Sequence, residues 1–326
     1  MANLEVAGRK SLVLLSGGAF PELAEEIAGH IGSTITPTTR RRFANGELFI
    51  RPNESVRGSD AFVIQSHTDP INEWVMESLI LVDALKRASA KRITVVAPFY
   101  PYARQDKKHR GREPISARLI ADLFKTAGAD RLMAVDLHTA QIQGFFDGPV
   151  DHLFALPILA DYVRKRYGHE DLIVVSPDTG RVRMAEQWAD ALGGLDIAFV
   201  HKTHSIDAAN EVVANRVVGA VAGRAALLID DMIDTAGSIS KAADLLFAEG
   251  ATDVIVAATH GIFSASATDR LKNSQVREVI VTNTLPIRPE QEFDKLTVLS
   301  IAPLLGKAIK EVFEDGSVTS LFAGRS

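Results

Sequence analysis

One stretch of the sequence, residues 224–250, restricts the fold more than any other. It begins with the apolar run Ala225–Ile229, and a continuous run without polar alternation is typical of a parallel strand buried on both faces. After Ser238, apolar residues recur at helical spacing, and Gly250 stands where the helix is expected to end. A buried parallel strand that leads directly into a helix predicts an α/β fold.

The junction between this strand and helix carries the first candidate site. A loop of small residues at a helix N-terminus presents backbone N–H groups to a phosphate, and two preceding carboxylates suit sugar hydroxyls. The alternative is a loop that only caps the helix. Adjacent carboxylates at the end of an apolar strand are costly without a ligand or cation, which favours a phosphorylated-sugar site. Its residues are Asp230, Asp231, Asp234, Thr235, Ala236, Gly237 and Ser238.

The chain also contains two similar segments, which suggest an internal repeat. Asp83–Pro98 aligns without a gap with Asp244–Thr259, although helix–turn–strand units are too common for this to prove duplication. The length of 326 residues suggests two domains. We therefore predict an α/β protein of two similar domains, each a mainly parallel sheet flanked by helices.

Composition narrows the function classes. A net charge of −5 argues against a general nucleic-acid binder. The absence of cysteine excludes disulfides and thiolate metal sites and makes a cytoplasmic location natural. Because no apolar run approaches the ~20 residues of a membrane helix, we expect no membrane span.

Two segments in the first half carry turn and charge signals. Asn45-Gly46 predicts a hairpin turn before the strand Leu48–Arg51. Residues 98–110 combine prolines and aromatics with a burst of cations. This segment is either a basic surface loop or an anion-binding loop for nucleotide phosphates, and the residues leave both interpretations open.

Further polar residues follow predicted strands. Asp136 and His138 stand two apart on extended chain, so they share one face and suit a hard divalent ion bound through nucleotide phosphates. A structural core histidine is the alternative for His138. Asp178 follows the strand Leu172–Ser176, and open α/β sheets bind ligands outside such strand ends.

Three segments of the second half of the chain have no candidate site residue derived from their pattern, but each predicts a local structure. Residues 201–210 are polar and without periodicity, which predicts a mobile loop. Residues 303–313 predict a closing helix, and residues 317–322 a short strand.

The segment Asp136–Asp151, DLHTAQIQGFFDGPVD, resembles the signature of the ribose-phosphate pyrophosphokinase (phosphoribosyl pyrophosphate synthetase) family. The resemblance extends from about Leu12 to Phe322. Five more segments occur in that family's order and spacing: RRFANGE, FYPYARQDKK, SPDTGRVR, DDMIDTAGS and VTNTLP.

The resemblance implies a reaction and an architecture. The family transfers the β,γ-diphosphoryl group of ATP to O1 of ribose 5-phosphate, with Mg²⁺, and its members form hexamers of two type I phosphoribosyltransferase-like domains. Here it implies an ATP-binding domain of residues 1–154 with 305–326. Residues 155–304 would then form the ribose-5-phosphate-binding domain.

The resemblance also assigns roles to residues. It implies sugar binding by Asp230 and Asp231, and 5-phosphate binding by the loop 234–238. It implies Mg²⁺ positions at His138 and Asp178, with Asp136, Asp147 and Asp151 as nearby acids. ATP would be bound by Phe43, Asn45, Gly46, Glu47, Arg104 and Gln105, the hairpin reaching a neighbouring subunit's site. Allosteric phosphate or ADP would be bound near Ser55, Arg57, Ser317 and Thr319.

One position departs from the family pattern. A catalytic Lys-x-Arg in the family's loop is here Lys202-Thr203-His204. Histidine has a pKa of ~6.5 and is mostly neutral at pH 7, unlike a permanently charged arginine. Either another cation substitutes, with Arg181, Arg183 and Arg216 as candidates, or the chain is a catalytically weak regulatory relative. A phosphoribosyltransferase that consumes the product is a further rival, but it would leave RRFANGE and FYPYARQDKK unexplained.

Overall fold

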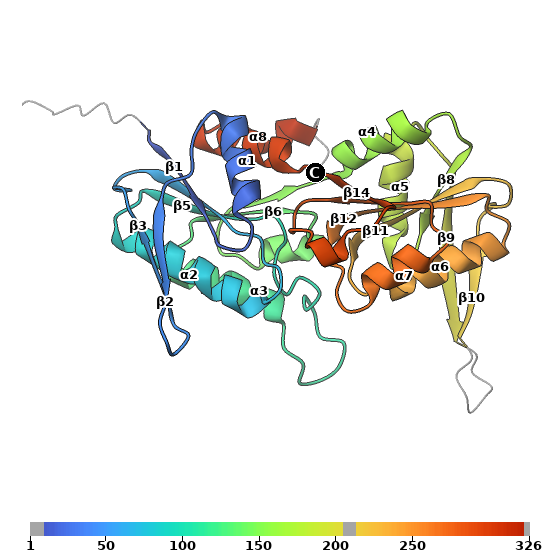
Figure 1. Ribbon diagram of the computed structural model, residues 1–326, viewed down its shortest axis with the longest axis horizontal. Helices are drawn as coiled ribbons and strands as arrows, with labels where there is room; N and C mark the ends of the chain where they lie inside the picture. The colour runs from blue at the N-terminus through green and yellow to red at the C-terminus, as the bar shows by residue number, and fades with distance from the viewer. Residues whose placement is uncertain (1–9, 205–212, 323–326) are drawn as a thin grey trace, which may run out of the picture. The chain divides into compact units, whose positions relative to one another are not determined.

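The computed structural model describes residues 10–204 and 213–322, and the chain divides into two compact units. Unit 1 comprises Met1–Leu153 and Ala302–Ser326, and unit 2 comprises Phe154–Ile301. Each unit contains its own sheet and its own helices (Figure 1).

The sheet of unit 1 has the strand order β1-β4-β5-β6-β7, and all of its pairings are parallel. Helices α1 and α8 pack together on one face of this sheet, and α2 and α3 pack together on the other (Figure 1). The strands are β1 (Leu12–Ser16), β4 (Asp60–Ile64), β5 (Arg92–Ala97), β6 (Arg131–Val135) and β7 (Val150–Leu153). The helices are α1 (Pro21–Ile31), α2 (Ile71–Arg87), α3 (Ser116–Ala127), α8 (Ala302–Phe313) and the short η1 (Ala140–Gly144).

A separate antiparallel hairpin extends from unit 1. Its strands are β2 (Thr38–Arg42) and β3 (Leu48–Pro52), with Arg40 opposite Ile50. Gly46 at the turn has a φ of 92°, a conformation that glycine adopts without strain. The predicted hairpin is therefore confirmed.

The sheet of unit 2 has the order β10-β9-β8-β11-β12-β13-β14, parallel except for the antiparallel pair β9–β10. Helix α4 lies on one face, and α6 and α7 lie on the other (Figure 1). The strands are β8 (Leu172–Ser176), β9 (Ile197–His204), β10 (Val213–Val218), β11 (Ala225–Ile233), β12 (Asp253–Gly261), β13 (Glu278–Thr282) and β14 (Leu296–Leu299). The helices are α4 (Leu156–Tyr167), α5 (Val182–Ala191), α6 (Gly237–Ala248), α7 (Ala267–Asn273) and the short η2 (Thr179–Arg181) and η3 (Pro289–Gln291).

The two units repeat one topology. The order β1-β4-β5-β6-β7 corresponds strand by strand to β8-β11-β12-β13-β14. The two similar sequence segments fall on equivalent elements: Asp83–Pro98 covers the end of α2 and β5, and Asp244–Thr259 covers the end of α6 and most of β12. The predicted fold, two similar parallel-sheet halves flanked by helices, is confirmed.

Three segments differ from expectation. β11 continues past the acidic pair to Ile233, because Met232 and Ile233 still pair with His260 and Gly261 of β12. Residues 201–204, predicted as loop, are part of β9 because they pair with β10; residues 205–212 lie outside the described residues. Residues 318–322 form the 3₁₀ helix η4 instead of a strand, since the Ser320 N–H donates to the carbonyl of Ser317.

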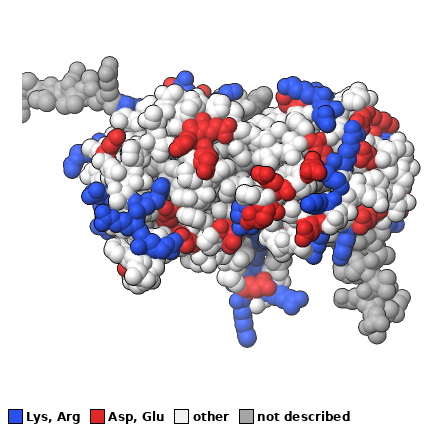
Figure 2. All heavy atoms as spheres, in the orientation of Figure 1, with Lys and Arg blue, Asp and Glu red and all other residues white. Residues whose placement is uncertain are grey.

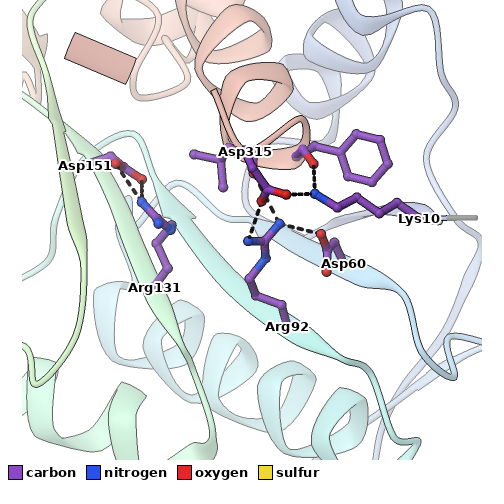
Figure 3. Close-up of polar contacts among 8 residues, drawn as sticks. Lys10, Asp60, Arg92, Arg131, Asp151 and Asp315 are labelled. Atoms are coloured by element: carbon purple, nitrogen blue, oxygen red, sulfur yellow. Dashed lines mark hydrogen bonds and ion pairs between the residues drawn. The ribbon is translucent and has the colours of Figure 1, made fainter. Parts of the chain in front are cut away.

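The last helix is held to unit 1 by ion pairs around Arg92, at the start of β5 (Figure 3). The Arg92 guanidinium donates to Asp60, to Asp315 at 3.2 Å and to the carbonyl of Val312 at 3.2 Å. Lys10 also pairs with Asp315, and the Asp60 side chain is only 6% exposed. This cluster joins the first residues of the interior strands β4 and β5 to the segment that follows α8.

Among the described residues, none of the helices combines the length and the apolar character that crossing a membrane requires.

Candidate active site

In unit 2 an acidic pair lies near the end of β11. The Asp231 side chain is 2% exposed and that of Asp230 is 19% exposed. Burial and the neighbouring carboxylate of Asp231 raise the pKa of Asp230 well above its ordinary value, while the cation of Arg181 opposes the rise. Two buried carboxylates of one sign demand a counter-charge, and the structure supplies one.

That counter-charge is Arg181. Its Nη2 donates to Asp231 Oδ1 at 2.8 Å, and its Nε lies 3.5 Å from Asp230 Oδ1. Arg181 is placed by η2, whose first turn is capped by Asp178: the Gly180 N–H donates to Asp178 Oδ1 at 2.8 Å. The predicted metal residue Asp178 therefore also shapes the turn that delivers Arg181.

The loop 234–238 connects β11 to α6. Ala236 has a φ of 58° and precedes the first residue of the helix, Gly237. The first amides of a helix have no intrahelical partner, so they are available to an anion at this point. Thr235 and Ser238 are exposed beside them, and Asp234 accepts a hydrogen bond from the Ser264 hydroxyl.

A second arginine braces this loop and was missed in the sequence. Arg270 of α7 donates through Nη1 to the carbonyl of Thr235 at 2.8 Å. A Cβ on Gly237 would lie 3.4 Å from the same Nη1, so the guanidinium passes close to the loop. A lone arginine on a seven-residue helix, 35 positions away, gives no local signal of this contact.

The ladder between β9 and β10 locates the predicted catalytic residues. Lys202 stands opposite Asn215, and His204 stands opposite Val213, while Arg216 stands opposite His201. Lys202 and His204 therefore belong to the part of β9 that pairs with β10, the strand that carries Arg216. The side chains of Lys202 and His204 lie outside the described residues.

In unit 1 the loop between β5 and α3 carries the predicted ATP residues Arg104 and Gln105, both exposed. Figure 2 shows lysine and arginine side chains projecting at the bottom of the view, over this loop. Gln105 Oε1 accepts a 2.6 Å hydrogen bond from Ser116 at the start of α3. The loop therefore presents cations to solvent while its base is fixed.

Asp106 in the same loop faces inward and is 4% exposed. Its Oδ2 accepts from the Thr139 hydroxyl at 2.6 Å and from Gln141 Nε2 at 2.7 Å. Both donors follow His138 in the chain, so one carboxylate joins two segments that lie apart in the sequence.

The predicted metal residues of unit 1 follow β6. Asp136 has a φ of 39° and His138 is half-buried. Asp151, at the far end of the signature, is instead engaged by Arg131 through bonds of 2.8 and 2.9 Å (Figure 3). Among the described residues there is no group of three or more histidine or acidic side chains that could hold a metal ion without further ligands.

The hairpin tip carries the remaining ATP residues. Phe43 is 51% exposed, and Asn45, Gly46 and Glu47 are exposed beside it. The hairpin base is fixed, because Arg40 Nε lies 3.2 Å from the buried carboxylate of Glu77. Lysine and arginine side chains also gather over this hairpin, at the left of Figure 2.

The candidate allosteric residues lie in two exposed segments of unit 1. Ser55 and Arg57 precede β4, and Ser317 and Thr319 lie at η4.

Comparison with known proteins places these features in a family. A model described as the N-terminal domain of ribose phosphate pyrophosphokinase matches residues 12–128, and one described as the phosphoribosyl synthetase-associated domain matches residues 206–323. Curated proteins named ribose-phosphate pyrophosphokinase are 64% identical in Streptomyces coelicolor, covering 99% of each chain, and 63% identical in Mycobacterium tuberculosis, covering 97% of each. The crystal structure of phosphoribosylpyrophosphate synthetase from Mycobacterium smegmatis aligns with a TM-score of 0.90 at 61% identity, over 94% of this chain and 100% of that one.

Proposed function

This chain belongs to the ribose-phosphate pyrophosphokinase family, and from that premise we propose that it transfers the intact β,γ-diphosphoryl group of ATP to O1 of ribose 5-phosphate. The products are phosphoribosyl pyrophosphate and AMP.

The observation that carries the proposal is the end of β11 with the loop that follows it. The carboxylates of Asp230 and Asp231 are acceptors for sugar hydroxyls, and the amides at the start of α6 suit a phosphate. Both chemistries stand within one strand–loop–helix unit, where Asp231 and the first helical residue Gly237 are six positions apart. A molecule with vicinal hydroxyls and a terminal phosphate, such as ribose 5-phosphate, matches both.

ATP is assigned to unit 1. Arg104 and the cations after Asp106 suit its phosphates, and Phe43 offers an exposed aromatic face to the adenine ring. In this proposal Asn45 and Glu47 read the edge of the base. The fixed hairpin base at Arg40 and Glu77 supports that role, because a reading loop must be held in place.

Mg²⁺ is part of the proposal, with His138 and Asp136 as candidate residues in unit 1 and Asp178 as a separate candidate in unit 2. These donors fit an ion that takes most of its ligands from phosphates and water. When bound, the ion would neutralise charge on the phosphoryl oxygens.

The chain's own part in the transfer is positioning and charge. Asp230, Asp231 and the loop 234–238 hold the sugar so that its O1 can attack the β-phosphorus of ATP in line. Lys202 supplies a positive charge to the diphosphoryl group as it is transferred. No covalent bond to the protein is needed. A hexamer in which the hairpin reaches a neighbouring site is also proposed, and light scattering in solution would test it.

The regulatory alternative is not favoured, because relatives at least 60% identical over nearly the whole chain are named as the enzyme. The alternative of a phosphoribosyltransferase that consumes phosphoribosyl pyrophosphate does not explain why residues 12–128 match the N-terminal domain of ribose phosphate pyrophosphokinase.

The test is release of AMP from ATP and Mg²⁺, followed by chromatography, with ribose 5-phosphate and with unphosphorylated ribose as the matched control. We expect AMP with the first sugar and at least 100-fold less with the second, because the loop 234–238 then binds nothing. Equal AMP release with both sugars, or none with either, would refute the proposal.

A further inference from the structure

We propose that Arg181 is a positioning residue for the sugar substrate: it bridges Asp230 and Asp231 and holds both carboxylates ready to accept the hydroxyls of ribose 5-phosphate. This inference rests on the proposed function and adds a residue to its sugar site.

The geometry favours this role over direct binding of the transferring diphosphoryl group by the Arg181 cation. Arg181 meets Asp231 at 2.8 Å and Asp230 at 3.5 Å, and its side chain is 19% exposed. An arginine fork committed to two acids is not a free cation awaiting a phosphoryl group. It acts on the substrate through the carboxylates.

The fold makes the placement firm. The Ser176 hydroxyl donates to the Asp178 carbonyl at 2.6 Å, and the Asp178 side chain caps the turn that Arg181 completes. The Asp231 N–H also donates to Asp230 Oδ1 at 2.8 Å, which orients that carboxylate. The ion pairs of Arg181 with Asp230 and Asp231 therefore connect the turn after β8 to β11.

The pair needs its cation to stay ionised. Burial and Asp231 favour a proton on Asp230, and Arg181 opposes it. The neighbouring strand β12 presents Ala258 opposite Asp230 and His260 opposite Met232. His260 Nδ1 lies 2.8 Å from the Thr284 hydroxyl, Asp178 caps η2, and Asp234 bonds Ser264, so each of these groups has its own partner. Without Arg181, we expect the pair to hold a proton up to a higher pH than in the wild type, and a protonated pair is a poorer acceptor of sugar hydroxyls.

The experiment compares wild type, Arg181→Gln and Arg181→Lys, with Arg164→Gln as the control. Arg164 is a 55% exposed arginine of α4 in the same unit. AMP release is measured against ribose 5-phosphate and against ATP, and ribose 5-phosphate binding is measured by calorimetry. We expect Arg181→Gln to raise the KM for ribose 5-phosphate at least tenfold, while kcat and the KM for ATP change less than threefold. Arg181→Lys should fall between, because an ammonium satisfies one carboxylate.

The pH dependence adds a readout that a structural role would not change. The rise in KM for ribose 5-phosphate should be larger at pH 6.5 than at pH 8.5 in Arg181→Gln, while Arg164→Gln behaves as wild type. If Arg181→Gln is too unstable to purify, Arg181→Lys compared with Arg164→Gln gives the same test by calorimetry.

Two results would overturn the inference. A loss of kcat with unchanged KM for ribose 5-phosphate would assign Arg181 to the transferring group, and unchanged kinetics would assign it to stability alone. If the wild type releases no AMP, the proposed function is wrong. The role of Arg181 is then tested by calorimetry alone, which compares ribose 5-phosphate binding in wild type and in the Arg181 variants.

Discussion

Asp106 and Thr139 are 33 positions apart in the chain, yet the Thr139 hydroxyl donates a 2.6 Å hydrogen bond to Asp106 Oδ2. Gln141 donates to the same oxygen at 2.7 Å. One buried carboxylate therefore fixes the loop of Arg104 and Gln105 to the stretch that contains His138.

We predict that Asp106→Ala lowers kcat/KM for ATP at least tenfold. The change removes the acceptor of the Thr139 hydroxyl and leaves Gln141 Nε2 with only the Asp106 carbonyl, at 3.4 Å. We expect this to cost about 1–3 kcal/mol and to free the loop on which ATP is proposed to bind. Steady-state kinetics measures the effect, and Asp122→Asn is the control because that aspartate is a 50% exposed partner of Arg118. Wild-type kinetics in Asp106→Ala would contradict the link.

The second prediction concerns His204. One of the three candidate replacements for the expected arginine is already engaged, because Arg181 is held by the acidic pair. We therefore expect His204→Arg to raise kcat at pH 7–8, with an upper bound of about 10³–10⁵-fold set by arginines that act in phosphoryl transfer.

The matched change is Lys202→Ala, which should lower kcat while leaving the KM for ribose 5-phosphate near its wild-type value. A His204→Arg variant no faster than wild type would show that the histidine is not a deficit.

The third prediction concerns His67, which is fully buried between the Phe99 carbonyl at 3.3 Å and the Ser78 hydroxyl at 3.2 Å. Burial lowers the pKa of His67 to about 4. Between pH 6.5 and 4 the unfolded chain binds a proton here that the folded chain does not, so stability falls as the pH falls. The expected loss from pH 7.5 to pH 5 is about 2 kcal/mol.

Urea unfolding followed by tryptophan fluorescence at both pH values measures this loss. In His67→Gln the difference between the two pH values should shrink by about that amount. The surface change His169→Gln should leave the difference intact, since that side chain is 77% exposed. Equal pH dependence in all three proteins would contradict the assignment.

The fourth prediction separates two partners of Arg92. Arg92→Met leaves the carboxylate of Asp60, 6% exposed, without its cation, and should destabilise unit 1 by about 1–3 kcal/mol. Asp315→Asn removes an exposed partner and should cost far less. Hydrogen exchange of α8 and β5 measures both, and equal protection loss in the two variants would contradict a buried origin of the effect.

Much of the fold could be predicted from sequence because parallel strands buried on both faces are continuous apolar runs. β8 matches the predicted range Leu172–Ser176, and the hairpin follows from Asn45-Gly46. β9 was missed at residues 201–204 because its polar end is held by pairing with β10, which is not a local property. η4 was mistaken for a strand because a short apolar alternation does not distinguish a strand from a tight turn.

The candidate site divides in the same way. The acidic pair and the loop 234–238 carry local signals of strand end and helix start. The contacts of Arg181, Arg270 and Asp106 span 30 to 50 positions. They depend on which turn is delivered beside which strand, so the sequence could offer Arg181 only as one of three candidate cations.

The central claim is that the diphosphoryl group moves as one piece. The most direct measurement uses ATP labelled with ¹⁸O in the β–γ bridge, incubated with ribose 5-phosphate and Mg²⁺ and followed by ³¹P NMR. We expect the labelled bridge to stay between the two phosphorus atoms of the new diphosphate ester, with unlabelled AMP formed in equal amount. Formation of ADP with a singly phosphorylated sugar, or of free pyrophosphate without the ester, would contradict it.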